Sequence, residues 1–131
     1  MLKNDLPDDI RHCIEACWKC RTHCEKTLYH ICLAEGGEHV RQDHVRLMAD
    51  CIQICQTAAD FMTRGSALSA AVCGACAEVC HACADSCEQI ESEDMQECAR
   101  HCRNCAETCD EMSLSQGACE TDSTSETVIH L

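Results

Sequence analysis

The sequence is poor in the residues that usually build a protein core. Trp18, Tyr29 and Phe61 are the only aromatic residues among 131, whereas cores of this size normally depend on aromatic and large aliphatic side chains. Proline is equally scarce: Pro7 is the only one, so no helix interior is interrupted. Long apolar runs are missing too, and no stretch approaches the roughly 18 residues that a membrane span needs. We therefore expect a helical protein with an unusual core and no membrane partner.

Basic residues are also few. Ten lysines and arginines stand against 23 acidic residues, which gives a formal net charge of -13 at pH 7. Such a chain is a poor nucleic-acid binder, because phosphates must be neutralised by lysine and arginine. Residues 1–9 contain neither the apolar segment of an export signal nor a twin-arginine pair. We expect a cytoplasmic protein, in which thiols stay reduced.

Cysteine is abundant, with seventeen residues. All but one recur at helical spacings, since steps of three and four residues return to one face of an α-helix. They therefore occupy the stripe where a helix bundle normally places leucine. Free cysteine can fill a core, because a protonated thiol behaves as a small hydrophobe. The runs are Cys13, Cys17, Cys20, Cys24 and Cys32; Cys51 and Cys55; Cys73, Cys76, Cys80, Cys83 and Cys87; and Cys98, Cys102, Cys105 and Cys109.

Start and stop signals divide the chain into four expected helices. Pro7 and the two acids after it suit a helix start, Gly36 and Gly65 suit helix ends, and Ser92 suits an N-cap. The fold class expected is all-α: an up-down-up-down antiparallel four-helix bundle with a cysteine-lined core. Residues 1–113 form this domain, and the polar residues 114–131 are expected to be a mobile tail. The expected helices are 7–35, 38–64, 66–90 (starting at Ser66 or Ser69) and 92–113.

Helical phase separates central from marginal cysteines. Cys32 lies about 80° from the centre of its stripe in a regular α-helix, which makes it the least certain interior member. Cys119 falls in the predicted tail, off every stripe, and its role is left open. The second helix contributes only two cysteines, but its stripe continues through His44 and Met48. Four such faces can point at one axis.

The pattern favours soft metal ions over other uses of cysteine. Two cysteines four residues apart in a helix hold their Cβ atoms about 5–6 Å apart, too far for a disulfide. Structural zinc needs only four ligands per ion, and neither an iron–sulfur motif nor a helix-opening redox C-x-x-C is present. Cu(I) fits best, because it is thiophilic and accepts few ligands. Each C-x3-C step is then a potential site within one helix: 13/17, 20/24, 51/55, 76/80, 83/87, 98/102 and 105/109.

On these C-x3-C and C-x2-C-x3-C repeats, residues 7–113 resemble the bacterial copper storage proteins. The resemblance implies a four-helix bundle that packs Cu(I) along its cysteines, and a homotetramer. The family has exported and cytosolic branches, and the expected absence of an export signal points to the cytosolic branch. It also implies an entrance built from methionine and histidine, and the His44 and Met48 end matches that description. The alternative entrance lies at the opposite end, beside Met62 and Met112.

The sequence thus predicts storage and buffering of many Cu(I) ions, with His44 and Met48 added to the sixteen stripe cysteines as ligands. We expect no enzyme activity, since interchangeable thiols indicate capacity and no nucleophile–base pair stands out. The main alternative is a general thiol-rich detoxification or zinc-buffering protein. An interaction module whose cysteines only pack, and a chaperone that carries a single ion, fit the repeats less well.

Overall fold

The computed structural model describes residues 6–124, with side chains up to residue 115. Within these residues all regular structure is helical. The longest helices are α1 (Asp8–Lys26), α3 (Gln42–Thr63), α4 (Ser69–Glu88) and α5 (Glu93–Thr124). Shorter segments join α1 to α3: a π-helical segment η1 (Thr27–Cys32), a single turn α2 (Leu33–Glu35) and a 3-10 segment η2 (Gly37–Val40).

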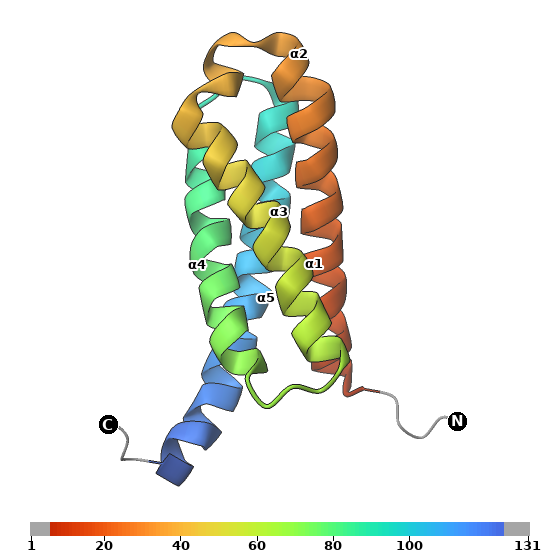
Figure 1. Ribbon diagram of the computed structural model, residues 1–131, viewed down its shortest axis with the longest axis vertical. Coiled ribbons are helices and arrows are strands. Elements are labelled where there is room, and N and C mark those ends of the chain that lie inside the picture. The colour runs from red at the N-terminus through yellow and green to blue at the C-terminus, as the bar shows by residue number, and fades with distance from the viewer. Residues whose placement is uncertain (1–5, 125–131) are drawn as a thin grey trace.

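The four long helices form an antiparallel bundle (Figure 1). Helix α1 packs beside α3 and α5, and α4 also packs beside α3 and α5. The chain therefore runs up, down, up and down around a square, as predicted. We call the end of the bundle that carries α2 and the α4–α5 turn the upper end. The end that carries the α3–α4 turn and the start of α1 is the lower end.

The turns form where the sequence predicts them. Gly36 ends the first helical stretch with a φ of 71°, a left-handed conformation that glycine adopts at little cost. Gly65 has a φ of 69°, and two backbone hydrogen bonds, from Gly65 N to Met62 O and from Ser66 N to Phe61 O, complete a Schellman motif. Ser92 caps α5, since its Oγ accepts a hydrogen bond of 3.2 Å from Met95 N.

The π-helical segment η1 changes the phase of the first helical stretch. A π turn contains one residue more than an α turn, so it sets back the following residues by about 100° around the helix axis. The eight-residue step from Cys24 to Cys32 then behaves like a seven-residue step, and the expected offset of about 80° becomes about 20°. This local change explains why Cys32 is fully buried.

The end of α5 differs from the prediction. The helix was expected to end near Ser113, but its backbone continues to Thr124, so this expected boundary is wrong. No helix-breaking proline or positive-φ residue occurs in this stretch. The role of Cys119 stays open, because its side chain lies outside the described ones, and residues 125–131 lie outside the described chain. The division into a bundle and a mobile tail stays a prediction.

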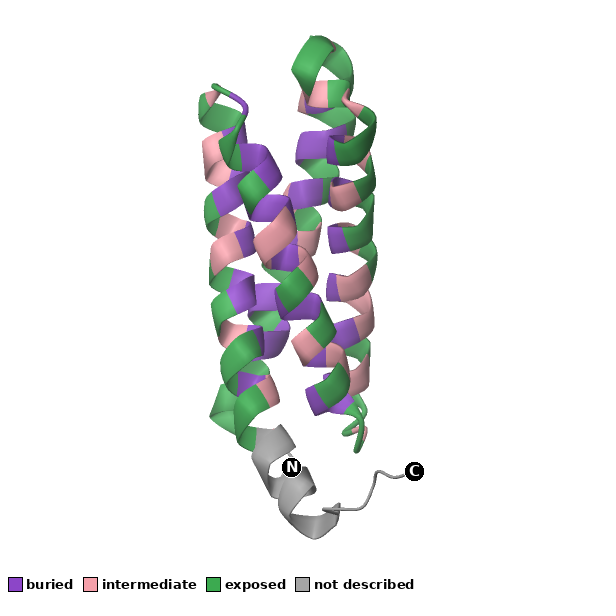
Figure 2. Ribbon diagram, turned by 90° about the vertical axis from the view of Figure 1, so that its left-hand side faces the viewer, coloured by how far each residue is buried: buried purple, intermediate pink, exposed green. Residues whose placement is uncertain are grey.

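Burial follows the helical stripes. Figure 2 shows the buried positions running along the inward faces of the helices, with exposed positions outside. Alanines such as Ala58, Ala77 and Ala106 fill the space between cysteines and are at most 1% exposed. No helix within residues 6–124 has the combination of length and apolar character required to span a bilayer.

Candidate metal centre

The core of the bundle is built from thiols. All sixteen cysteines from Cys13 to Cys109 are unpaired and buried, and Cys13 is the only one with as much as 1% of its surface exposed. Because the thiols replace the usual large side chains, the interior is both the hydrophobic core and a row of soft ligands.

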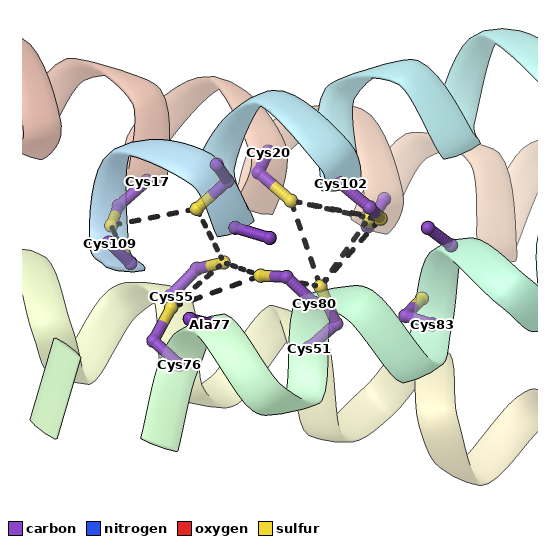
Figure 3. Close-up of a cluster of buried hydrophobic side chains, with 14 of the residues drawn as sticks. Cys17, Cys20, Cys51, Cys55, Cys76, Ala77, Cys80, Cys83, Cys102 and Cys109 are labelled. Atoms are coloured by element: carbon purple, nitrogen blue, oxygen red, sulfur yellow. Dashed lines mark hydrogen bonds between the residues drawn. The ribbon is translucent and has the colours of Figure 1, made fainter. Parts of the chain in front are cut away.

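These thiols gather into four compact groups. Within each group, every sulfur lies within 4.8 Å of the others, and neighbouring groups share members, so the groups form a continuous ladder along the axis. Figure 3 shows the central part of this ladder, where sulfurs from different helices point toward one another. From the lower end upward the groups are Cys13, Cys73 and Cys109; Cys17, Cys76, Cys105 and Cys109; Cys20, Cys55, Cys80 and Cys105; and Cys20, Cys24, Cys51 and Cys102.

Most of the close sulfur pairs join different helices. Cys24 of α1 lies 3.5 Å from Cys102 of α5, and Cys51 of α3 lies 3.7 Å from Cys80 of α4. Separations of about 3.8 Å are what two thiolates bound to one ion at roughly tetrahedral angles require, given metal–sulfur bonds of about 2.3 Å. Metal ions can therefore be held between helices with little movement of the backbone.

Among the predicted steps within one helix, two have short sulfur–sulfur distances. Cys20 and Cys24 are 3.9 Å apart, and so are Cys76 and Cys80. The remaining C-x3-C steps stay predictions. The sequence does not predict the groups that span helices, because helical phase places a residue on a face but does not fix which residue it meets across the core.

Hydrogen bonds between thiols separate the cysteines by acidity. A hydrogen bond with Cys102 contributes most to lowering the pKa of Cys51 well below its usual range. A hydrogen bond with Cys102 is also the main cause that lowers the pKa of Cys83, to about 7. Burial has the opposite effect on Cys32 and raises its pKa to about 11. Since the thiolate is the form that binds metal, a protonated thiol of this core must release its proton when it binds an ion.

The upper end of the core has mixed donors. Met48 places its sulfur 3.5 Å from Cys83 and 3.7 Å from Cys87. His44, a predicted ligand at the same end, lies beside Cys32, with 3.7 Å between Nε2 and Sγ. His44 and Met48 have no exposed surface.

Two residues that contact these donors were not among the predicted site residues. Met95 places its sulfur 3.8 Å from that of Cys32, and Ser86 Oγ lies 2.8 Å from His44 Nδ1. Both are buried. The position of Met95 near its cysteine stripe was a usable signal, whereas nothing in the sequence indicates that Ser86 meets a histidine forty-two residues away.

The histidines outside the core make surface contacts. His23 and His101 stack across the α1–α5 seam, with ring centroids 4.2 Å apart. Burial, followed by the charge of His101, lowers the pKa of His23. His81 joins a network on the α4–α5 seam, in which Arg103 lies 3.2 Å from His81 Nδ1 and 3.0 Å from Glu88 Oε1. These contacts hold helices together outside the ladder.

The fold and its core define a class: a four-helix bundle whose interior is a reservoir of thiol ligands for soft metal ions. Comparison with known proteins identifies the family within that class. A model of the copper storage protein family matches residues 7–114. The chain therefore belongs to the copper storage protein family.

Solved structures of similar proteins have the same architecture. The chain is 48% identical to the Nmul_A1745 protein from Nitrosospira multiformis, over 82% of this chain and 96% of that one, with a TM-score of 0.79. It is 33% identical to the Cu(I)-bound copper storage protein BsCsp3 from Bacillus subtilis (81% and 99% covered, TM-score 0.76). A cytosolic copper storage protein from Streptomyces lividans, studied during copper loading with five coppers, is 30% identical (82% and 93% covered, TM-score 0.75). No curated protein matches the chain.

Proposed function

We propose that this chain stores and buffers Cu(I), many ions at a time, on the thiolates that line its bundle. The observation that carries the proposal is the ladder of four overlapping, buried cysteine groups. Within each group, all sulfurs lie within 4.8 Å of one another. Soft thiolates select Cu(I), which accepts two or three such ligands. The proposed ligands are the sixteen cysteines of the ladder and its upper end, together with His44 and Met48. The family is one of storage proteins, and we assign the chain no catalytic step.

Storage follows from how the ladder binds and exchanges ions. A thiol that takes up Cu(I) releases its proton to solvent, and no electron is transferred. Because neighbouring groups share sulfurs, such as Cys20 and Cys105, an ion can move to an adjacent group by exchanging one ligand at a time. The protein can thus hold many ions in a closed, water-poor interior and still redistribute them.

The test is an anaerobic titration of the reduced protein with Cu(I) against a competing chelator. We expect about ten or more tightly bound ions per chain, because each ion needs only two or three of the sixteen thiolates and thiolates can bridge. Cys119→Ser serves as a control and should leave the capacity unchanged, since that residue lies off every predicted stripe. Saturation at about one to four ions would contradict storage.

Zinc buffering remains the second candidate, because groups of four cysteines also suit tetrahedral zinc. Simultaneous addition of Zn²⁺ and Cu(I) separates the two. Storage of Cu(I) predicts that zinc leaves the protein as Cu(I) is added, whereas retention of zinc would favour the alternative.

The lower end is the better candidate for the entrance. His44 and Met48, which favour the upper end on sequence grounds, are completely buried, whereas Met112 at the lower end is 4% exposed. Met112 also lines a groove of about 480 Å³ with His12 and the carboxylates of Asp8, Asp9 and Glu111. Negative charge attracts a cation, and thioether and imidazole are neutral donors that bind and release it. Met112→Leu should slow loading without reducing capacity; slower loading in Met48→Leu alone would place the entrance at the upper end.

We also propose a cytosolic homo-oligomer, with the tetramer implied by the family resemblance. The related protein from Streptomyces lividans is described as cytosolic. Helix α1 and the segment after it expose Trp18, Tyr29 and Leu33 at 47%, 57% and 54% of their surfaces, an apolar set that a second copy would cover. Light scattering of the purified protein tests this, and a monomer at all concentrations would contradict it.

A further inference from the structure

Two imidazoles and a carboxylate meet on the outside of the α1–α5 seam, away from the thiol core. They belong to His23 of α1 and to Glu97 and His101 of α5, and none of them is among the proposed Cu(I) ligands. The rings of His23 and His101 stack with centroids 4.2 Å apart, and His101 Nε2 lies 3.4 Å from Glu97 Oε2. Both imidazoles line a surface hollow of about 300 Å³.

The register of the two helices brings these three side chains together. Each of them directly precedes a buried cysteine in the sequence. Those cysteines meet in the core, where the sulfur of Cys24 lies 3.6 Å from that of Cys98 and 3.5 Å from that of Cys102. Neighbouring residues of a helix are about 100° apart around its axis, and because α1 and α5 are antiparallel, the preceding residue turns to the same side of the seam in both. The contact that joins the thiols inside therefore also sets the arrangement outside.

The distances suit ligands of one divalent ion. With bonds of about 2.0 to 2.1 Å to nitrogen and oxygen, tetrahedral ligands place two donor atoms about 3.3 Å apart. The 3.4 Å between His101 Nε2 and Glu97 Oε2 agrees with this value, whereas it is longer than an ordinary N–H···O hydrogen bond. His23 is half-buried, so its ring can turn about the side-chain bonds and direct a nitrogen at the same ion.

A neighbouring residue prepares the carboxylate for this role. Arg100 donates a hydrogen bond to Glu97 Oε1 and leaves Oε2, the oxygen near His101, for an ion. Carboxylates that bind metals are commonly held by such hydrogen bonds, so Arg100 is a positioning residue. Burial, together with the positive charges of His101 and Lys26, lowers the pKa of His23, which favours the neutral imidazole that binds metal.

The donor atoms select a different class of ion from the thiol ladder. Two imidazoles and one carboxylate are a set with which proteins bind Zn²⁺ and other divalent first-row ions. Cu(I) prefers thiolates, which are available in the core. One carboxylate leaves the complex with a single positive charge, which water can solvate at a surface site, and a water molecule can occupy the fourth position on the side of the hollow.

We propose that His23, Glu97 and His101 form a binding site for a divalent transition-metal ion such as Zn²⁺, separate from the thiol ladder, that joins the first and last long helices of the bundle. The site goes beyond the proposed storage of Cu(I), because it uses none of the same ligands and selects another class of ion. All three ligands bind through lone pairs, any proton on an imidazole passes to solvent, and no electron is transferred.

The experiment is a titration with Zn²⁺ of the full-length protein after anaerobic loading with Cu(I), which occupies the thiols. Bound zinc is measured by equilibrium dialysis, and the imidazoles are followed by NMR of ¹⁵N-labelled histidine. We expect about one Zn²⁺ per chain and a joint shift of the His23 and His101 signals, each assigned by its loss in the glutamine variant. His81 is the internal control and should not shift, since it lies between Asp110 and Arg103 on the α4–α5 seam.

Variants test the role of each ligand. Loss of a group beyond the ligands of a metal costs about 10- to 100-fold in affinity. His23→Gln, His101→Gln and Glu97→Gln should therefore each raise the free Zn²⁺ needed for half-saturation by about 100-fold or more, and Arg100→Gln by about 10-fold. His81→Gln, a change of the same kind on the other seam, should leave the affinity for zinc unchanged.

The outcomes separate this proposal from the storage function. Absence of zinc binding in the loaded protein, or binding that moves neither His23 nor His101, would overturn the seam site and leave storage intact. Equal affinity in His23→Gln and the parent chain would overturn it as well, and so would an equal loss in His81→Gln. If Cu(I) saturates at a few ions, storage fails, but a joint shift of the two imidazole signals that His23→Gln abolishes would still support the seam site.

Discussion

Cys20 is a shared ligand of the ladder, because its sulfur, like those of Cys105 and Cys109, belongs to two of the four cysteine groups. It lies 3.7 Å from the sulfur of Cys51 and 3.9 Å from that of Cys102. Cys13, on the same helix, belongs to one group only. The change Cys20→Ala therefore removes a ligand from two groups at once, and Cys13→Ala provides a matched control.

The magnitudes follow from this sharing. Each Cu(I) needs two or three thiolates, so we expect Cys20→Ala to lose about two ions per chain and Cys13→Ala about one. Both residues are almost completely buried, and the loss of one buried sulfur leaves a small cavity that costs about 1 kcal/mol. The two apo variants should therefore unfold at similar temperatures, about 4 °C below the parent chain.

Capacity is measured by anaerobic Cu(I) titration against a chelator, and stability by thermal unfolding of the reduced apo forms. Equal losses of copper in the two variants would refute the idea that shared sulfurs determine capacity. A much larger loss of stability in one variant would show that folding, and not ligand number, explains its copper content.

Three further predictions concern caps, pH and metal removal. Ser92→Ala removes the cap on α5 and should lower the free energy of unfolding by about 1 kcal/mol; Ser92→Thr should retain most of it, and an unchanged midpoint in Ser92→Ala would contradict the capping role. The pKa of His23 is lowered in the folded state, so the unfolded chain takes up its proton first and stability falls as the pH drops below about 6.5. In His23→Gln, the free energy of unfolding in urea should depend less on pH between about pH 5 and 7. Part of the pH dependence should remain, because burial also lowers the pKa of His44. His30→Gln is the control, and an equal effect in that variant would contradict the prediction. Removal of copper should leave the far-UV circular dichroism nearly unchanged, because protonated thiols still fill the core; loss of helix would show that folding depends on the metal.

The sequence predicts the bundle well because cysteine marks the buried stripe of every helix. Phase arithmetic alone places Cys17, Cys80 and Cys105 in the core, and the glycine and serine signals locate the turns. It does not predict which sulfurs meet across the core, since this depends on the rotation and axial offset of neighbouring helices. His44 and Met48 illustrate the limit: they share a helix face one turn apart, yet His44 meets Cys32 of η1 whereas Met48 meets Cys83 and Cys87 of α4.

The end of α5 and the phase of Cys32 show a second limit. The polar composition after Ser113 predicts that the helix ends there. A helix can nevertheless continue through polar residues when no proline or other helix-breaking residue interrupts it. The π-helical segment is not predicted either. It differs from an α-helix only by one extra residue in a turn, and no residue type in the sequence marks where that extra residue lies.

That segment has a consequence for changes in chain length. Loss of one residue from an α-helix normally rotates everything beyond it by about 100° and separates a buried face from its partners. Within Thr27–Cys32 the opposite holds, because deletion of the exposed Tyr29 or His30 would convert the π turn into a regular α turn and keep Cys32 facing the core. We therefore expect the first helical stretch to tolerate the loss of one residue at this place without turning the buried thiol of Cys32 away from the core.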